Sequence, residues 1–156
     1  MDVARAVARR STCLRRAVGC VLVDRHGCVI STGYNGVAPG MPHCNEATGR
    51  VAVSDTADPR YPWAEEYANA CPGAQAPSGT ALDACLAAHA ETNALVTCRL
   101  PFEVGTCYVT TAPCVNCVKG LLRTSCDRIV FAEDYPTSGR DLWVANGRDW
   151  VKFDPK

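Results

Sequence analysis

Residues 18–32, VGCVLVDRHGCVIST, contain two short β-rich runs on either side of a polar segment that ends in glycine. Polar residues ending in Gly between two such runs are typical of a hairpin turn. We therefore predict strands at 18–23 and 28–32, joined through Asp24-Arg25-His26-Gly27. The chain is expected to begin its sheet with this antiparallel pair.

Helical and β-type patterns alternate along the rest of the chain. Residues 2–10 place apolar side chains at helical spacing. The other expected elements are a helix at 81–96, whose start could lie as late as His89, a strand at 106–111, a helix at 115–122, a strand at 128–131, a helix at 141–146 and a strand at 150–153. A hairpin followed by alternating strands and helices predicts an α/β fold with three layers, α-β-α, around a mixed five-stranded sheet.

The length of 156 residues fits one domain. Residues 34–79 hold most of the prolines and show no sustained hydrophobic period. A structureless segment of this length is uncommon in a compact domain, and is usually functional or pinned from within. We expect a single domain over residues 1–156 with a long loop insertion at about 34–79.

Charge and hydropathy argue against several classes of partner. Sixteen basic side chains balance sixteen acidic ones, so no strong net field is available to attract a nucleic-acid backbone. No apolar run approaches the length of a membrane span, and residues 1–5 lack the apolar core of a signal peptide. We expect a cytoplasmic protein that binds neither nucleic acid nor membrane.

The cysteine count directs attention to metal chemistry. Eleven cysteines, an odd number without a secretory signal, favour reduced thiols over a disulfide framework. Within His89-Ala90-Glu91 and Pro113-Cys114-Val115-Asn116-Cys117, one imidazole and two thiolates supply three zinc ligands and leave a fourth position for water. If a helix begins just after Pro113, the positive end of the helix dipole lowers the pKa of the Cys114 and Cys117 thiols. Glu91, two residues from His89, is placed to move protons rather than to bind metal.

Each motif alone has an ordinary interpretation. An isolated H-x-E is common by chance, and an isolated C-x-x-C could be a redox pair or half of a structural zinc site. In this order the two match the known signature of zinc deaminases, H-x-E followed by P-C-x-x-C. In that chemistry zinc lowers the pKa of a water from about 16 toward about 7. Glu91 is then the residue that carries protons to the ring and to the departing amine.

Beyond these motifs the chain resembles the deoxycytidylate (dCMP) deaminase family, including its bacterial late-competence and phage members. The resemblance is carried by RRSTCLRR (9–16), VG (18–19), TGYNG (32–36), GMPHC (40–44), HAETNA (89–94), YVT (108–110), PCVNC (113–117) and EDYP (133–136). It implies a cytidine-deaminase-like fold and zinc-dependent conversion of dCMP to dUMP and ammonia, supplying dTMP synthesis. It also implies a homo-oligomer, often a hexamer, with dCTP and dTTP as effectors.

The resemblance assigns substrate contacts by position. Asn35 is expected to hydrogen-bond the sugar or the base, Tyr135 to lie near the nucleotide, and Ala90 to join the substrate-binding residues. Arg15 and Arg16 are the candidates for binding the 5′-phosphate, which needs local positive charge. Asn35 could instead only shape its turn. Tyr135 could belong to the core, and most arginine clusters are merely solvated.

Several remaining cysteines and one histidine suggest a second, structural zinc, as some members of that family carry. We expect its ligands to be Cys13, His43, Cys71 and Cys85, because a tetrahedral structural zinc site needs four protein ligands. Cys44 is the first alternative to any one of them. These thiols could instead be ordinary buried ones. The other five cysteines are assigned to packing: Cys20, Cys28, Cys98, Cys107 and Cys126.

Two alternative functions stay open at this point. The chain could be another deaminase, acting on cytidine, CMP, a 5-substituted dCMP or a base in tRNA, although its neutral charge disfavours tRNA. It could also be a non-catalytic zinc scaffold. Glu91 separates these classes, because a purely structural site does not require a carboxylate there.

Overall fold

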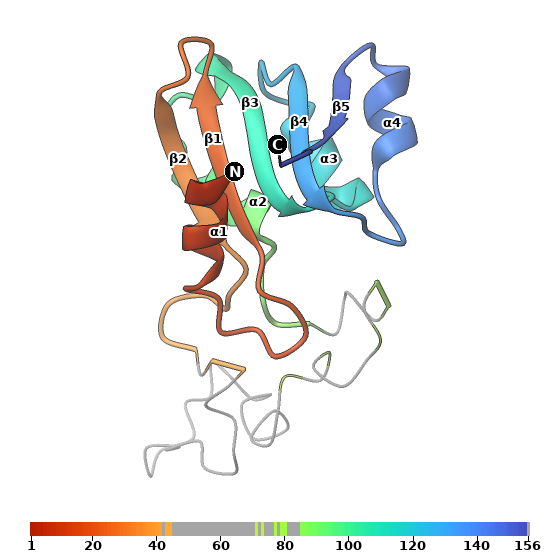
Figure 1. Cartoon of the computed structure of the whole chain (residues 1–156). Helices are drawn as coiled ribbons and strands as arrows, with labels where there is room; N and C mark the ends of the chain where they lie inside the picture. Colours follow the sequence, from red (N-terminus) through yellow and green to blue (C-terminus); the bar gives the residue numbers. More distant parts are fainter. Residues whose placement is uncertain are drawn as a thin grey trace, which may run out of the picture.

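The computed structural model describes residues 1–41, 43–44, 71, 73, 77, 79–80 and 85–155 (Figure 1). The strands are β1 (Gly19–Asp24), β2 (Val29–Tyr34), β3 (Val104–Thr111), β4 (Arg128–Glu133) and β5 (Asp149–Lys152). The helices are α1 (Asp2–Ala8), α2 (Ala90–Thr97), α3 (Val115–Leu121) and α4 (Arg140–Ala145), and a short 3₁₀ helix, η3 (Pro101–Glu103), leads into β3.

The five strands form one sheet in the order β2-β1-β3-β4-β5. β1 pairs antiparallel with both β2 and β3, whereas β3, β4 and β5 run parallel to one another. Parallel neighbours need a crossover connection, and α3 and α4 provide the two that this sheet contains. The predicted α/β fold with a mixed five-stranded sheet is confirmed.

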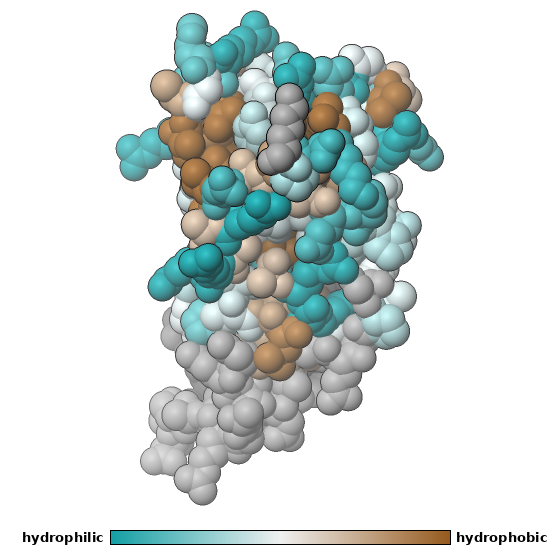
Figure 2. Space-filling view, in the orientation of Figure 1, coloured by the Kyte–Doolittle hydropathy of each residue, from teal (hydrophilic) through white to brown (hydrophobic). Residues whose placement is uncertain are grey.

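Helices cover both faces of the sheet, which gives the three layers (Figure 1). α1 packs on one face, where Ala4 is buried with Val21 and Val23. The main core lies on the other face, where α2, α3 and α4 cover the sheet with Ala94, Leu121 and Trp143 among their buried side chains. The face that carries α1 is mostly hydrophilic, with hydrophobic side chains in small groups (Figure 2).

Two glycines on neighbouring strands allow helices to approach the sheet closely. A Cβ atom on Gly19 would lie 2.1 Å from the carbonyl oxygen of Ala4 in α1. One on Gly33 would lie 2.3 Å from both the carbonyl oxygen of Ala90 and the backbone nitrogen of Ala94 in α2. No side chain fits in these gaps, so the two glycines fix how closely α1 and α2 pack on the sheet.

The structure differs from the sequence prediction at the start of α2. The predicted helix at 81–96 begins only at Ala90, because Ala88 exchanges two backbone hydrogen bonds with Gly36, at 3.1 and 2.9 Å, and is therefore extended. β2 continues through Tyr34, so the connection predicted at 34–79 begins at Asn35. Most of that connection, including 45–70, lies outside the described residues. The single-domain assignment over 1–156 stays a prediction.

Among the described residues, no helix has both the length and the apolar character that crossing a bilayer requires.

Candidate metal centre and cleft

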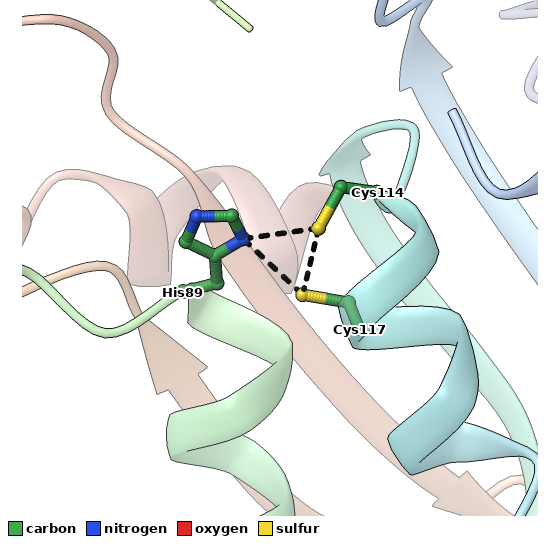
Figure 3. Close-up of side chains that lie close together, drawn as sticks. All are labelled: His89, Cys114 and Cys117. Carbon is green, nitrogen blue, oxygen red and sulfur yellow. Dashed lines mark hydrogen bonds between the residues drawn. The ribbon is translucent and has the colours of Figure 1, made fainter. Parts of the chain in front are cut away.

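His89, Cys114 and Cys117 meet where α2 and α3 begin. The Nδ1 atom of His89 lies 3.4 Å from Cys114 Sγ and 3.3 Å from Cys117 Sγ, and the two sulfur atoms are 3.7 Å apart. Figure 3 shows the imidazole ring, from the start of α2, directed at the two sulfurs of α3. Both cysteines are buried, and the histidine is partly buried. The residues predicted to hold the catalytic zinc therefore converge.

The three donor atoms have the spacing of a tetrahedral zinc site. With Zn–S bonds of about 2.3 Å and Zn–N bonds of about 2.1 Å, tetrahedral angles put two sulfurs about 3.8 Å apart and a sulfur and a nitrogen about 3.6 Å apart. The observed 3.7 Å and 3.3–3.4 Å match these edges closely. Two thiolates and an imidazole are also the donor set that zinc favours. These residues fit a zinc ion and leave its fourth position to another ligand.

Local structure explains why these side chains point together. His89 and Cys114 are the N-cap residues of α2 and α3, both in extended conformation, and Cys117 lies within the first turn of α3. Pro113 ends the preceding segment, as expected for a helix that starts just beyond it. The unsatisfied N–H groups and the dipole of a helix start favour negative charge, so the thiolates lie where anions are stabilised.

Hydrogen bonding at this cluster favours the charged forms of Cys114 and His89, whereas the hydrogen bond with Cys114 raises the pKa of Cys117. The thiol of Cys117, and to a lesser extent His89, lower the pKa of Cys114 to about 4. The hydrogen bond from Cys114 in turn raises the pKa of His89. A thiolate at Cys114 is the form that binds a metal.

Glu91 lies beside the cluster rather than in it. Its side chain is 4 % exposed, and burial is the main cause that raises its pKa. It also hydrogen-bonds the side chain of Cys117, which brings the carboxyl next to the three donor atoms. A carboxyl with a raised pKa can both accept and donate a proton near neutral pH.

A cleft opens beside this centre, between the carboxyl end of β3 and the segment that leads into β1. Every residue that the sequence assigned to substrate binding lines this cleft. Cys114 of the metal centre also lines it, and so do Cys13 and Cys85, two of the predicted ligands of the second zinc. The lining residues are Cys13, Arg15, Arg16, Val18, Asn35, Cys85, Ala87, His89, Ala90, Glu91, Thr111, Ala112, Cys114 and Tyr135.

Asn35 anchors one wall of this cleft. Its side chain is buried, donates a hydrogen bond to the carbonyl of Arg16 at 2.7 Å, and accepts one from the backbone N–H of Val18 at 2.8 Å. Its backbone carbonyl accepts a further bond from the Ser11 hydroxyl at 3.0 Å. The amide is therefore engaged with the chain itself, and its clearest role is to hold residues 16–18 against the cleft.

The two arginines lie along the rim with different partners. Arg15 donates to the carbonyls of Pro77 and Thr80 at 2.7 and 3.0 Å, and so ties these two residues to the cleft. Arg16 pairs with Glu133 at 3.4 Å, and its guanidinium carbon lies 5.9 Å from the centre of the Tyr135 ring. Tyr135 is partly buried, which raises its pKa.

A second group of four thiols lies beyond the rim. The Sγ atoms of Cys71 and Cys85 are 4.0 Å apart. Cys13 hydrogen-bonds Cys85, and Cys44 hydrogen-bonds Cys71, so the four sulfurs form a continuous chain of contacts. His43, expected as a ligand in the sequence analysis, instead has its Nδ1 atom 3.1 Å from the Thr12 hydroxyl. The structure places Cys44, the substitute, beside the other three residues.

Backbone amides surround these sulfurs. The N–H of Leu86 donates to Cys71 Sγ at 3.4 Å. The other three sulfurs each accept at least one backbone hydrogen bond, from residues 15–16 to Cys13, from Leu14 to Cys44 and from Ala87 to Cys85. Gly73 lies against Cys85, where a Cβ atom would come within 2.9 Å of the Cys85 Cα and Cβ atoms. The hydrogen bond with Cys85 lowers the pKa of Cys13 to about 5, whereas burial raises the pKa of Cys44 to about 12.

Thr111 is a polar lining residue that the sequence had not indicated. Thr111 ends β3 and is 5 % exposed in the cleft wall. Its one sequence signal is its position, three residues before Cys114. The family resemblance is carried by YVT at 108–110 and PCVNC at 113–117, and Thr111 lies between the two.

The chain was compared with known proteins at the level of sequence. Residues 1–133 match the family described as "Cytidine and deoxycytidylate deaminase zinc-binding region". The deoxycytidylate deaminase of Mycobacterium phage D29 is 34 % identical over 136 residues, which cover 86 % of this chain and 91 % of the phage protein. That of Schizosaccharomyces pombe is 34 % identical over 140 residues, 86 % of this chain but only 36 % of the yeast protein. The chain thus spans about a third of the length of this yeast relative.

Solved structures agree on the fold. The dCMP deaminase of the cyanophage S-TIM5, crystallised in complex with dCMP and dUMP, superimposes with a TM-score of 0.63 at 21 % identity, over 97 % of this chain and 92 % of that one. The match over most of the sequence, the shared fold and the zinc-compatible His-Cys-Cys centre lead to one conclusion. The chain belongs to the cytidine and deoxycytidylate deaminase family.

Proposed function

We propose that the protein hydrolyses dCMP to dUMP and ammonia. The observation that carries this proposal is the position of Glu91, a buried carboxyl beside the His89, Cys114 and Cys117 donor atoms, at the wall of a cleft. A purely structural zinc site does not require a buried carboxyl beside its ligands. The phage relative that shares most of its length with this chain is a deoxycytidylate deaminase, which favours dCMP over other cytosine compounds.

His89, Cys114 and Cys117 would hold the zinc, which when bound supplies an activated water at neutral pH. Glu91 would accept a proton from the attacking water and deliver it to the ring nitrogen next to the amino-bearing carbon, which makes that carbon electrophilic. The water oxygen bonds to this carbon, and Glu91 takes the remaining proton from the added hydroxyl. It later passes a proton to the amine, which departs as ammonia. Its raised pKa suits a group that must accept and donate in one cycle.

Residues around the cleft would orient the nucleotide. Ala90, the first residue of α2, has a backbone N–H without an intrahelical acceptor and can donate to the base. Arg15 and Arg16 would meet the 5′-phosphate, for which they supply positive charge at the rim. Tyr135 would pack near the nucleotide, and Asn35 would act by holding residues 16–18 in place. We extend the proposal to a cytoplasmic homo-oligomer, such as a hexamer, that responds to dCTP and dTTP.

We also propose a second zinc site, structural in role, formed by Cys13, Cys44, Cys71 and Cys85. Four thiols linked by successive contacts, Cys13 to Cys85 to Cys71 to Cys44, supply the ligand types of a Cys₄ structural zinc site. Backbone N–H groups directed at the sulfurs would stabilise thiolates there. Such an ion would join residues far apart in sequence in a region with few apolar side chains of its own.

The proposed activity is tested by measuring ammonia release from dCMP, CMP, dCTP, deoxycytidine and 5-methyl-dCMP with the zinc-loaded protein. We expect the highest kcat/KM for dCMP. A higher value for another compound of the set would reassign the substrate within the same chemistry. No release from any of them, by protein that contains its zinc, would leave the scaffold function in its place.

A further inference from the structure

The hydroxyl of Thr111 stands out among the described residues. It is their one buried side-chain nitrogen or oxygen atom without a hydrogen-bond partner. Burying a hydroxyl without a partner is destabilising, and folded proteins nearly always provide one. Because Thr111 lines the cleft, its missing partner can be a bound ligand.

Thr110, the neighbouring residue in β3, provides a comparison because its hydroxyl does have a hydrogen-bond partner. Thr110 Oγ1 accepts a hydrogen bond from the backbone N–H of Gly19 at 3.1 Å. Successive side chains of a strand point to opposite faces, so Thr110 and Thr111 face opposite sides of β3. Thr111 shares its side with Val109, which packs in the core with Ala90 and Ala94 of α2. The unpartnered hydroxyl is therefore on the side of the sheet that carries the metal ligands.

We propose that Thr111 is a substrate-binding residue, whose hydroxyl is satisfied by the pyrimidine ring of the bound nucleotide. This inference rests on the proposed function. Thr111 lies three residues before Cys114, close to where the reacting base must lie. A hydroxyl can both donate and accept, which suits the amino and carbonyl groups of a cytosine. A phosphate, by contrast, would be matched by Arg15 and Arg16, which line the same cleft.

A substrate-binding role and a purely structural role of the Thr111 hydroxyl predict different effects on activity and on thermal stability. Thr111→Val keeps the shape and removes the hydroxyl, whereas Thr111→Ser keeps the hydroxyl. In T111V we expect kcat/KM for dCMP to fall about 2- to 13-fold, the effect of losing one neutral hydrogen bond. The midpoint of thermal unfolding should stay equal or rise by about 2–4 °C, because an unsatisfied buried group is removed. T111S should retain most of the activity.

Deoxycytidine and Thr110→Val complete the experiment. The fold-change in T111V should be similar for dCMP and deoxycytidine, since both carry the pyrimidine. T110V, which loses a satisfied hydrogen bond, should lower the unfolding midpoint. Unchanged kcat/KM in T111V, or a loss confined to dCMP, would overturn the inference, and so would a drop in its midpoint as large as that of T110V. Wild-type protein that releases no ammonia from any cytosine compound would instead overturn the proposed function, and this inference with it.

Discussion

Gly33 of β2 lies so close to Ala94 of α2 that a Cβ atom on the glycine would come within 2.3 Å of the Ala94 backbone nitrogen. The first residue of α2 is held in the same way, since that Cβ would also lie 2.3 Å from the carbonyl oxygen of Ala90. His89 and Glu91 flank Ala90, so the position of both depends on this contact.

Gly33→Ala should therefore disturb the metal centre from a distance. Backbone atoms cannot yield as side chains do, and overpacking costs about 1–3 kcal/mol of stability. We expect lower stability in urea denaturation, with reduced zinc content and turnover. Gly36→Ala is the matched control, because among the described residues a Cβ there meets only the Tyr34 ring, at 3.3 Å. If G33A and G36A behave alike, β2 does not set the position of α2.

Glu91→Gln tests the proton-transfer role. The amide keeps the size of the side chain but cannot accept a proton, so turnover should fall by about 10²–10⁴-fold. The zinc content should be that of the wild type, because Glu91 is not a ligand. His89→Ala, Cys114→Ala and Cys117→Ala should lose the metal instead. Activity of E91Q within tenfold of the wild type would refute the proposed mechanism.

The four-cysteine cluster makes a prediction about metal content. Purified wild-type protein should contain a second zinc per chain, and Cys44→Ser should lose that ion while retaining the zinc at His89, Cys114 and Cys117. His43→Ala is the matched control, adjacent in sequence to Cys44, and should keep both ions if Cys44 rather than His43 is the ligand. Elemental analysis under reducing conditions measures this directly. A single zinc in the wild type would exclude the second site.

Replacing the rim arginines tests phosphate binding. Arg16→Gln removes a cation that pairs with the exposed Glu133, and the double variant with Arg15→Gln removes both charges. A charge-assisted hydrogen bond contributes about 1.5–3 kcal/mol, so KM for dCMP should rise about tenfold or more in the double variant. Deoxycytidine, which lacks the phosphate, should be affected little. Equal losses for both substrates would remove these arginines from phosphate recognition.

Buried thiols outside both metal groups predict a loss of stability at alkaline pH. Burial raises the pKa of Cys126, so its thiol stays protonated in the folded chain, while in the unfolded chain it titrates near about 8.5. A raised folded pKa means that this stabilisation is complete below the unfolded pKa and declines as pH rises above it, by up to about 1.4 kcal/mol per pH unit. Urea denaturation between pH 7.5 and 10.5 should show a shallower decline for Cys126→Ala. Identical slopes would show that this thiol does not contribute.

The sequence was informative where structure depends on neighbours in the chain. The two metal motifs are local, because His89 and Cys114 each cap the helix that follows, and spacing alone places Cys117 on the same face as Cys114. The order of strands and helices followed from local periodicity in the same way. These features needed no knowledge of distant contacts.

Other features depend on partners far away in the chain. Residues up to Ala88 have a helical composition, yet Ala88 pairs with Gly36 and stays extended. The proposal of Cys44 as a ligand rests on its contact with Cys71, a residue far away in the chain. Likewise, nothing near Arg15 indicates that it binds the carbonyls of Pro77 and Thr80.

The hydrogen-bonded pair of Gly36 and Ala88 closes the base of the connection between β2 and α2. Because both ends leave the sheet at one point, the length of chain between them can change without moving His89. The entropic cost of closing a loop grows slowly, by about 0.6 kcal/mol for each doubling of its length. The length and sequence of this connection can therefore vary, by evolution or by design, and change which molecules enter the cleft. The metal-binding residues would keep their positions.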